Sequence, residues 1–301
     1  MLLSVGLAAG LCIGEGVARV FPSTFGDENF ALAGAGNRPG CVRPSLTRGY
    51  EPIPGTCGTN AEGARDYAAG AQGVPVKVMV VGDSLSTFTL WPTTLAEAFS
   101  AGWARSVQLR TYGVPGYNTC QELSMFRERV AAFAPDVVLL QACANDVQGS
   151  PVLARSGGWT TYFSGNEAVE FPTWVLGSRL LTVGAMSFLP RVPLEGARSG
   201  REHTAGCLAG FRDEAPAIGA FLFPLFYPSD APPALLDEMA MRELLAESGI
   251  PFLDLRPSFE SAGPMVEHRD SPSDFIHPNR EGERVAARAI ATWWLEEFDE
   301  P

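Results

Sequence analysis

At its first long apolar run the chain reads Val76-Lys77-Val78-Met79-Val80-Val81-Gly82-Asp83-Ser84-Leu85. Residues 76–81 are rich in β-branched side chains with almost no polar interruption, as expected for a central parallel strand covered on both faces. Gly82 lets the chain turn directly after that strand. Ligands of open α/β sheets bind beyond the carboxyl ends of the strands, so Ser84 stands where chemistry takes place. An ordinary serine cap at the start of a helix is the alternative interpretation.

Apolar runs and amphipathic segments alternate along the rest of the chain. This alternation predicts right-handed crossovers and a parallel sheet, and therefore an α/β fold with five parallel strands. The predicted strands are residues 76–81, 107–112, 137–141, 218–225 and 251–255. The predicted helices are residues 92–102, 119–133, 233–248 and 279–297.

A serine hydroxyl needs a neutral imidazole within hydrogen-bond reach before it becomes a good nucleophile. The chain has three histidines, His203, His268 and His277, and only His277 has a carboxylate at a useful spacing. In Asp274-Phe275-Ile276-His277 the acid lies three residues before the imidazole, in a loop that precedes the last predicted helix. Such a carboxylate holds the imidazole in the right tautomer. The alternative is that Asp274 caps a turn and His277 begins the helix.

Two further segments offer hydrogen-bond donors for an oxyanion, and both follow predicted strands. Gly116 lies in Gly113-Val114-Pro115-Gly116-Tyr117-Asn118, where the missing side chain leaves a backbone N–H open to substrate. Asn145 lies in Ala142-Cys143-Ala144-Asn145-Asp146, where its amide is a possible donor. A turn glycine and a helix cap are the ordinary alternatives.

Four blocks follow one another along the chain: Gly82-Asp83-Ser84-Leu85, then Gly116, then Asn145-Asp146, then Asp274-x-x-His277. In this order they resemble the SGNH/GDSL hydrolase superfamily. The resemblance implies a flavodoxin-like three-layer α/β/α sandwich with a central five-stranded parallel sheet. It implies that Ser84 is the nucleophile, that His277 is the base and that Asp274 orients His277. It also implies an oxyanion hole made by the N–H groups of Ser84 and Gly116 and the amide of Asn145. No cofactor and no metal is implied.

The resemblance extends to Asn60-Ala61-Glu62-Gly63-Ala64-Arg65-Asp66, which is similar to the N-x-x-G-x-R segment of membrane-anchored bacterial members. Two positions depart from the family pattern. Cys143 stands where the family usually has a glycine, and Tyr112 lies in the strand where an asparagine is common. Both changes bear on the shape of the substrate pocket, since a thiol and a phenol are expected near the nucleophile.

The implied function is a serine ester hydrolase, esterase-like, lipase-like or a carbohydrate deacetylase, that acts through an acyl-serine on a small-molecule or glycan ester. One alternative keeps the acyl-enzyme but is an O-acyltransferase that modifies an envelope polysaccharide. Another is a catalytically silent carbohydrate- or lipid-binding module on the same fold. A nucleotide binder is disfavoured because the chain has neither a Walker A lysine nor G-x-G-x-x-G at the first strand–helix turn.

Length, charge and composition restrict the possibilities further. The 301 residues, 46% of them hydrophobic, fit one main domain at residues 71–301 with an insertion at about 148–210. Residues 21–70, dense in glycine and proline, predict an extended linker that packs on the domain. A formal net charge of −12 and a single lysine argue against a nucleic-acid partner. Residues 168–188 predict one or two helices, either covering the site or packing elsewhere on the core or membrane.

The N-terminal residues 1–20 begin with an apolar segment that carries no charge before Glu15. It predicts a signal or anchor segment, with association to a membrane and a catalytic domain outside the cytoplasm, in the periplasm or at the cell surface. A buried helix is the alternative. The cysteines lack C-x-x-C spacing, which argues against zinc. Cys41 and Cys57 are the first expected disulfide, and Cys120 with Cys143 the second, with free buried thiols as the alternative.

Overall fold

The computed structural model divides the chain into two compact units, Pro52–Gln148 with Ser199–Pro301, and Met1–Glu51 with Gly149–Arg198. The residues that it describes are 42–45, 48–69, 75–87, 91–102, 106–147, 200–229, 235–270 and 277–298, together with 152–156, 159–164, 167–172, 174–175 and several single positions up to 193.

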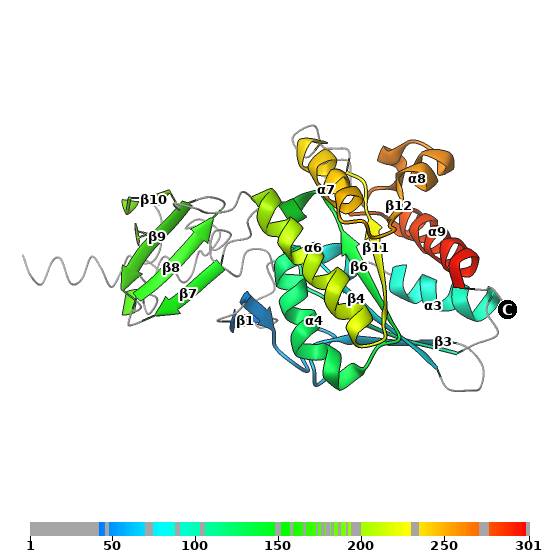
Figure 1. Ribbon diagram of the computed structural model, residues 1–301, viewed down its shortest axis with the longest axis horizontal. Helices are drawn as coiled ribbons and strands as arrows, with labels where there is room; N and C mark the ends of the chain where they lie inside the picture. The colour runs from blue at the N-terminus through cyan, green and yellow to red at the C-terminus, as the bar shows by residue number, and fades with distance from the viewer. Residues whose placement is uncertain are drawn as a thin grey trace, which may run out of the picture. The chain divides into compact units, whose positions relative to one another are not determined.

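The larger unit is built on a six-stranded sheet in the order β12-β11-β6-β4-β5-β3 (Figure 1). Five of its strands run parallel, and β3 at the edge runs antiparallel to β5. All five parallel strands were expected from the sequence. The strands are β3 (Arg65–Ala69), β4 (Val76–Gly82), β5 (Val107–Gly113), β6 (Val137–Ala142), β11 (Phe221–Phe226) and β12 (Leu253–Asp254).

Helices connect these strands and pack in pairs, α3 against α9 and α4 against α6 (Figure 1). The longer helices are α3 (Trp91–Gly102), α4 (Thr119–Phe133), α6 (Gly200–Ala217), α7 (Leu235–Glu247) and α9 (Arg280–Phe298). The shorter ones are α2 (Ser84–Thr87), α8 (Arg256–Ala262) and the 3₁₀ turns η4 (Ala144–Val147) and η7 (Met265–His268).

The central strand β4 is buried on both faces. Val78 and Val80 belong to the hydrophobic cluster that contains Trp294 of α9. Met79 and Val81 are equally buried but point to the opposite face, because successive side chains of a strand alternate. The sheet is therefore covered on both sides by helices, and the predicted three-layer α/β/α fold is confirmed.

The edge strand β3 was not predicted. It occupies residues 65–69, inside the segment that we expected to be an extended linker, and pairs in register from Arg65 opposite Thr111 to Ala69 opposite Val107. The preceding turn is held by Asn60, whose side-chain oxygen accepts the N–H groups of Glu62 and Ala64 at 2.8 and 3.1 Å.

The smaller unit contains antiparallel strands in the order β10-β9-β8-β7, and β1 (Val42–Ser45) and β2 (Gly49–Pro52) form a separate two-stranded sheet. The predicted helix is wrong at residues 168–172, which belong to a strand. Its side chains alternate, with Val169 and Phe171 buried and Glu170 exposed, which is the period of a strand. The four strands are β7 (Val152–Ser156), β8 (Trp159–Ser164), β9 (Glu167–Pro172) and β10 (Val192–Pro193).

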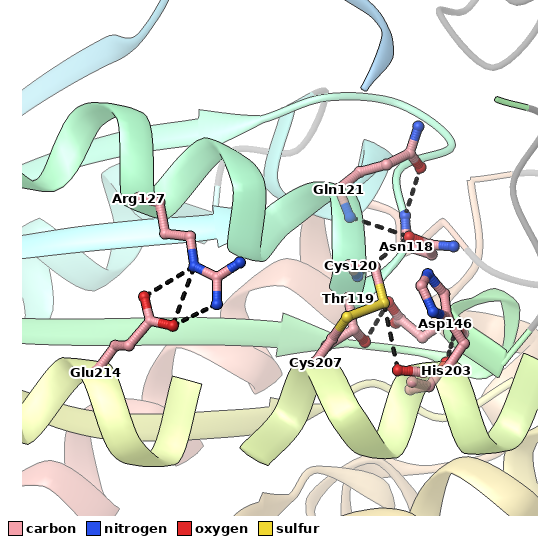
Figure 2. The surroundings of a disulfide bond; sticks show 10 residues. Asn118, Thr119, Cys120, Gln121, Arg127, Asp146, His203, Cys207 and Glu214 are labelled. Atoms are coloured by element: carbon pink, nitrogen blue, oxygen red, sulfur yellow. Dashed lines mark hydrogen bonds and ion pairs between the residues drawn. A yellow bond between two sulfur atoms is a disulfide. The ribbon is translucent and has the colours of Figure 1, made fainter. Parts of the chain in front are cut away.

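One disulfide bond joins Cys120 of α4 to Cys207 of α6 (Figure 2). The predicted pair of Cys120 with Cys143 is therefore wrong, and Cys143 is a buried thiol that forms no disulfide bond. The neighbouring helices decide this pairing, because α4 packs against α6 and places the two cysteines opposite each other. Cys57 is also disulfide-bonded, while Cys41, its expected partner, lies outside the described residues.

Within the described part of the chain, no helix is both long enough and apolar enough to cross a membrane. The apolar N-terminal residues on which the anchor prediction rests lie outside that part.

Candidate active site

The turn that follows β4 is too crowded for any side chain at Gly82. A Cβ atom there would lie 2.5 Å from Gln141 Oε1 and 2.5 Å from Ser86 Oγ. The Gly82 carbonyl accepts the N–H of Val114 at 3.0 Å, which ties the loop after β5 to the end of β4. Glycine is therefore required at this position by packing against the neighbouring strand and helix.

Asp83 fixes the turn from inside. Its carboxylate accepts the N–H of Leu85 at 2.8 Å, which caps the first turn of α2, and lies 3.4 Å from the thiol of Cys143. Its own N–H donates to Gln141 Oε1 at 3.1 Å, and the Ser86 hydroxyl donates to the same oxygen at 3.0 Å. Ser84 thus lies between Asp83, which Gln141 of β6 holds in place, and Leu85, which the Asp83 carboxylate holds in place. The sequence had assigned Gln141 only to a strand.

Ser84 and His277 meet although they lie 193 positions apart in the chain. The Oγ atom of Ser84 lies 2.7 Å from His277 Nε2, and both residues are half-buried. The predicted orienting acid, Asp274, lies outside the described residues. The two members of the predicted pair that the structure describes are therefore within hydrogen-bond distance.

Main-chain hydrogen bonds hold the segment that carries His277. The N–H of Asp270 donates to the His277 carbonyl at 3.0 Å, and the N–H of Asn279 donates to the His268 carbonyl at 2.7 Å. The side chain of Asn279 then accepts the N–H of Gly282 at 3.0 Å at the start of α9. This pairing fixes the backbone on the carboxyl side of the imidazole.

The two predicted oxyanion-hole segments lie at the carboxyl ends of the strands that flank β4. Gly116 follows β5 and has a φ of 77°, a conformation that favours glycine. Asn145 lies in η4 directly after β6, and its side chain is outside the described part of the chain. Because the sheet order is β6-β4-β5, the three blocks that contain Ser84, Gly116 and Asn145 share one edge of the sheet.

Two buried acids lie behind this edge. Asp146 accepts the N–H of Cys143 at 2.7 Å and the hydroxyl of Thr119 at 2.9 Å. The pKa of Asp146 is nevertheless raised to about 7, chiefly by burial and in smaller part by the nearby Asp83 charge. Glu122 of α4 is also buried, and its carboxyl has no hydrogen-bond partner within the described residues. Burial, with Asp146 and Asp83 nearby, holds the pKa of Glu122 well above its ordinary value, which favours the uncharged form of the carboxyl. The buried position of Glu122 could not be predicted from the sequence, since a glutamate in an amphipathic helix is usually solvated.

Asp146 should make the stability of the protein depend on pH. Its carboxyl holds a proton up to about pH 7 when folded, against 3.8 as its ordinary value. Between these values the folded state binds more protons, so the free energy of unfolding should fall as pH rises, by at most about 1.4 kcal/mol per pH unit. Urea unfolding at about pH 5 and about pH 8 measures this slope. The slope should be shallower in Asp146→Asn, and an equal slope in both proteins would contradict the assignment.

The two departures from the family pattern have different surroundings. Cys143 lies beside Asp83 in the turn, as described above. The hydroxyl of Tyr112 lies 3.1 Å from Glu62 Oε2, and burial raises the pKa of Tyr112 to about 12. Arg110 also bonds Glu62, at 2.6 Å, and Asp66, at 2.5 Å. The hydroxyl of Tyr112 therefore belongs to the contact that docks residues 60–66 on β5.

The family model of the GDSL-like lipase/acylhydrolase family matches residues 80–285, well over half of the chain. No curated protein sequence matches the chain. Similar solved structures include a lipase/acylhydrolase from Enterococcus faecalis, with 13% identity and a TM-score of 0.47, over 73% of this chain and 96% of that one. An acetyl xylan esterase, AlAXEase, shows 15% identity and a TM-score of 0.47, over 72% and 99%. The psychrotrophic esterase EstA from Pseudoalteromonas sp. shows 13% identity and a TM-score of 0.44, over 73% and 99%. The chain belongs to the GDSL-like lipase/acylhydrolase family and is a hydrolase that acts on ester bonds.

Proposed function

We propose that this hydrolase cleaves its ester through a covalent acyl-serine, with Ser84 as the nucleophile and His277 as the general base. The observation that carries the proposal is the 2.7 Å contact between Ser84 Oγ and His277 Nε2. A neutral imidazole at this distance accepts the hydroxyl proton as the oxygen attacks. Asp274, three residues before His277 in the sequence, is the proposed group that orients the ring.

The reaction has two steps, acylation of Ser84 and hydrolysis of the acyl-serine. Ser84 Oγ bonds to the carbonyl carbon while its proton passes to His277, and the resulting oxyanion is stabilised by the N–H groups of Ser84 and Gly116 and the amide of Asn145. Collapse of the intermediate breaks the ester bond, and His277 returns the proton to the leaving alcohol. Water then attacks the acyl-serine by the same steps and releases the acid. Transfer to a sugar hydroxyl in place of water would use the same acyl-enzyme, and it is recognised by an acylated sugar among the products.

A fluorophosphonate probe tests the nucleophile directly, because it forms a stable bond only with an activated serine. Mass spectrometry of peptides from the labelled protein should place the adduct on Ser84. His277→Ala should label far more slowly, and heat-unfolded protein should not label at all. An adduct on another serine, or equal labelling of the unfolded chain, would overturn the assignment.

Gln141 should matter for the rate although it is buried and touches no substrate. Gln141→Leu removes the oxygen that accepts both the Asp83 N–H and the Ser86 hydroxyl, so the turn around Ser84 loses its anchor. We expect kcat for p-nitrophenyl acetate to fall roughly a hundredfold, as for a misplacement of about 1 Å, with a smaller change in KM. Gln141→Glu keeps an acceptor oxygen and should retain more activity. A change confined to KM would contradict this role.

We also propose that the chain works in an oxidising space outside the cytoplasm. The Cys120–Cys207 disulfide and the disulfide-bonded Cys57 support this location, since such bonds rarely persist in the cytosol.

A further inference from the structure

Three ligand-type side chains gather where α4 contacts α6, away from Ser84. The sulfur atoms of Cys120 and Cys207 and a ring nitrogen of His203 all lie within 4.8 Å of one another (Figure 2). We propose that these residues bind one zinc-like divalent ion when the disulfide is reduced. The bound ion and the disulfide exclude each other, because each state needs both sulfur atoms.

The residue types match the ion. Two thiolates and a neutral imidazole are a set that Zn²⁺ prefers, and together they balance its charge. With bonds of about 2.3 Å to sulfur and about 2.0 Å to nitrogen, ligand atoms in a tetrahedral shell lie about 3.3–3.8 Å apart. The Cα atoms of Cys120 and Cys207 lie 5.2 Å apart, and the proposal requires their side chains to reach such separations by rotating once the disulfide is open. His203 is exposed, so solvent has access to the ion and supplies the fourth ligand.

The helices place these ligands in a favourable way. His203 and Cys207 are four residues apart on α6, so they lie on one face of that helix. Cys120 is the second residue of α4, where the positive end of the helix dipole favours a thiolate. The sequence argued against zinc because no C-x-x-C is present, and spacing along the chain does not reveal ligands from two helices.

Packing that does not involve sulfur holds the two helices together. The rings of Phe126 and Phe211 lie 5.3 Å apart between centroids. Arg127 follows Phe126 directly, and its Nε lies 3.0 and 2.9 Å from the two carboxylate oxygens of Glu214 on α6 (Figure 2). The ligands should therefore remain near one another when the disulfide opens.

A second anchor lies next to the ligands themselves. Thr119, adjacent to Cys120, donates its hydroxyl to the Asp146 carboxylate at 2.9 Å. Thr204, adjacent to His203, donates its hydroxyl to the Asp146 carbonyl at 2.8 Å. Both ligand-bearing segments are thus tied to η4 through one residue, which limits their separation in the reduced protein.

The redox step needs a reductant, and a dithiol suffices. Two electrons and two protons pass to the disulfide, Cys120 and Cys207 become thiols, and the dithiol becomes a disulfide. Binding of the ion then releases the two thiol protons. An oxidising space keeps the site closed, and a dithiol opens it.

Cobalt binding tests the proposal, because Co²⁺ bound by thiolates in a tetrahedral site has a distinctive visible spectrum. The full chain is reduced with a phosphine without oxygen, freed of reductant and titrated with Co²⁺. We expect one Co²⁺ per chain with a thiolate charge-transfer band, displaced by Zn²⁺, and no such spectrum from the oxidised protein. Removing a residue that only hydrogen-bonds to a metal ligand weakens metal binding about 10- to 100-fold. His203→Ala removes a ligand itself and should weaken Co²⁺ binding by at least that factor.

Matched controls use the other described cysteines. Cys57→Ala and Cys143→Ala should bind Co²⁺ as the wild type does, whereas Cys120→Ala and Cys207→Ala should not. The proposal is overturned if the reduced wild type binds no Co²⁺, or if His203→Ala binds as tightly as the wild type. Loss of the helical circular-dichroism signal on reduction would also overturn it, since the argument requires α4 and α6 to stay packed.

Discussion

Ser84→Ala and His277→Ala should each lower kcat for p-nitrophenyl ester hydrolysis by roughly 10⁶-fold. Each change removes one half of the pair that lies 2.7 Å apart, and a serine without its base is as ineffective as a base without its serine. The double variant should therefore be no slower than either single one. Steady-state rates with esters of graded chain length measure the effect, and KM should change much less than kcat.

Ser261→Ala provides a matched control, because Ser261 is an exposed serine of α8 in the same unit. It should leave the rate unchanged. Activity of Ser84→Ala within about tenfold of the wild type would rule out the acyl-serine mechanism, and strictly additive losses in the double variant would rule out a cooperating pair.

Trp91→Ala should be the most damaging single change to the stability of the larger unit. Trp91 is completely buried in the core cluster, and its ring N–H donates to the carbonyl of Leu85 in α2 at 2.7 Å. The substitution leaves a large cavity directly beneath the helix that begins with Ser84. We expect a loss of about 3–5 kcal/mol in the free energy of unfolding, measured by urea denaturation, and a parallel fall in kcat.

Two further variants complete this test, one that separates packing from hydrogen bonding and one that serves as a surface control. Trp91→Phe keeps a ring but removes the donor, and should cost about 1–3 kcal/mol. Trp174, which is 69% exposed, is the surface control, and Trp174→Ala should change the free energy of unfolding by no more than about 0.5 kcal/mol. A cost below about 1 kcal/mol for Trp91→Ala would contradict its role in the core.

The parallel strands and most of the helices between them could be predicted because these elements carry strong local patterns. Continuous apolar runs predicted β4 and β6. Apolar residues at helical spacing predicted α4, and its predicted bounds of 119–133 agree with the structure. The short strand β12 was predicted two residues too long at its start and one at its end, because a sequence pattern shows the type of an element better than its bounds.

The elements that the sequence did not reveal depend on distant partners. Residues 65–69 contain few apolar side chains, and they become β3 only by pairing with β5, about forty residues away. The helix α6 is rich in glycine, and its Gly210 allows close approach, because a Cβ there would lie 2.6 Å from Leu123 of α4. Disulfide pairing follows from that same helix contact, so spacing along the chain could not give it.

The active-site residues show the same contrast between those with a local sequence pattern and those that depend on the fold. Ser84 and His277 were identified because a hydroxyl after a strand and an acid–imidazole pair are recognisable in sequence, and the structure brings these two side chains together. Gln141 was missed because a single polar residue at the end of an apolar strand has no pattern of its own. Its importance comes from two neighbours, Asp83 and Ser86, that only the fold places around it.

The antiparallel strand β3 has a practical consequence for shortened versions of this protein. A fragment that begins at residue 71, the start of the domain expected from the sequence, would lack β3 and leave the N–H and C=O groups of β5 exposed along one side. Such an open border readily recruits strands from other molecules. The fragment would be prone to aggregate even if every catalytic residue were retained, so soluble preparations should start ahead of Asn60.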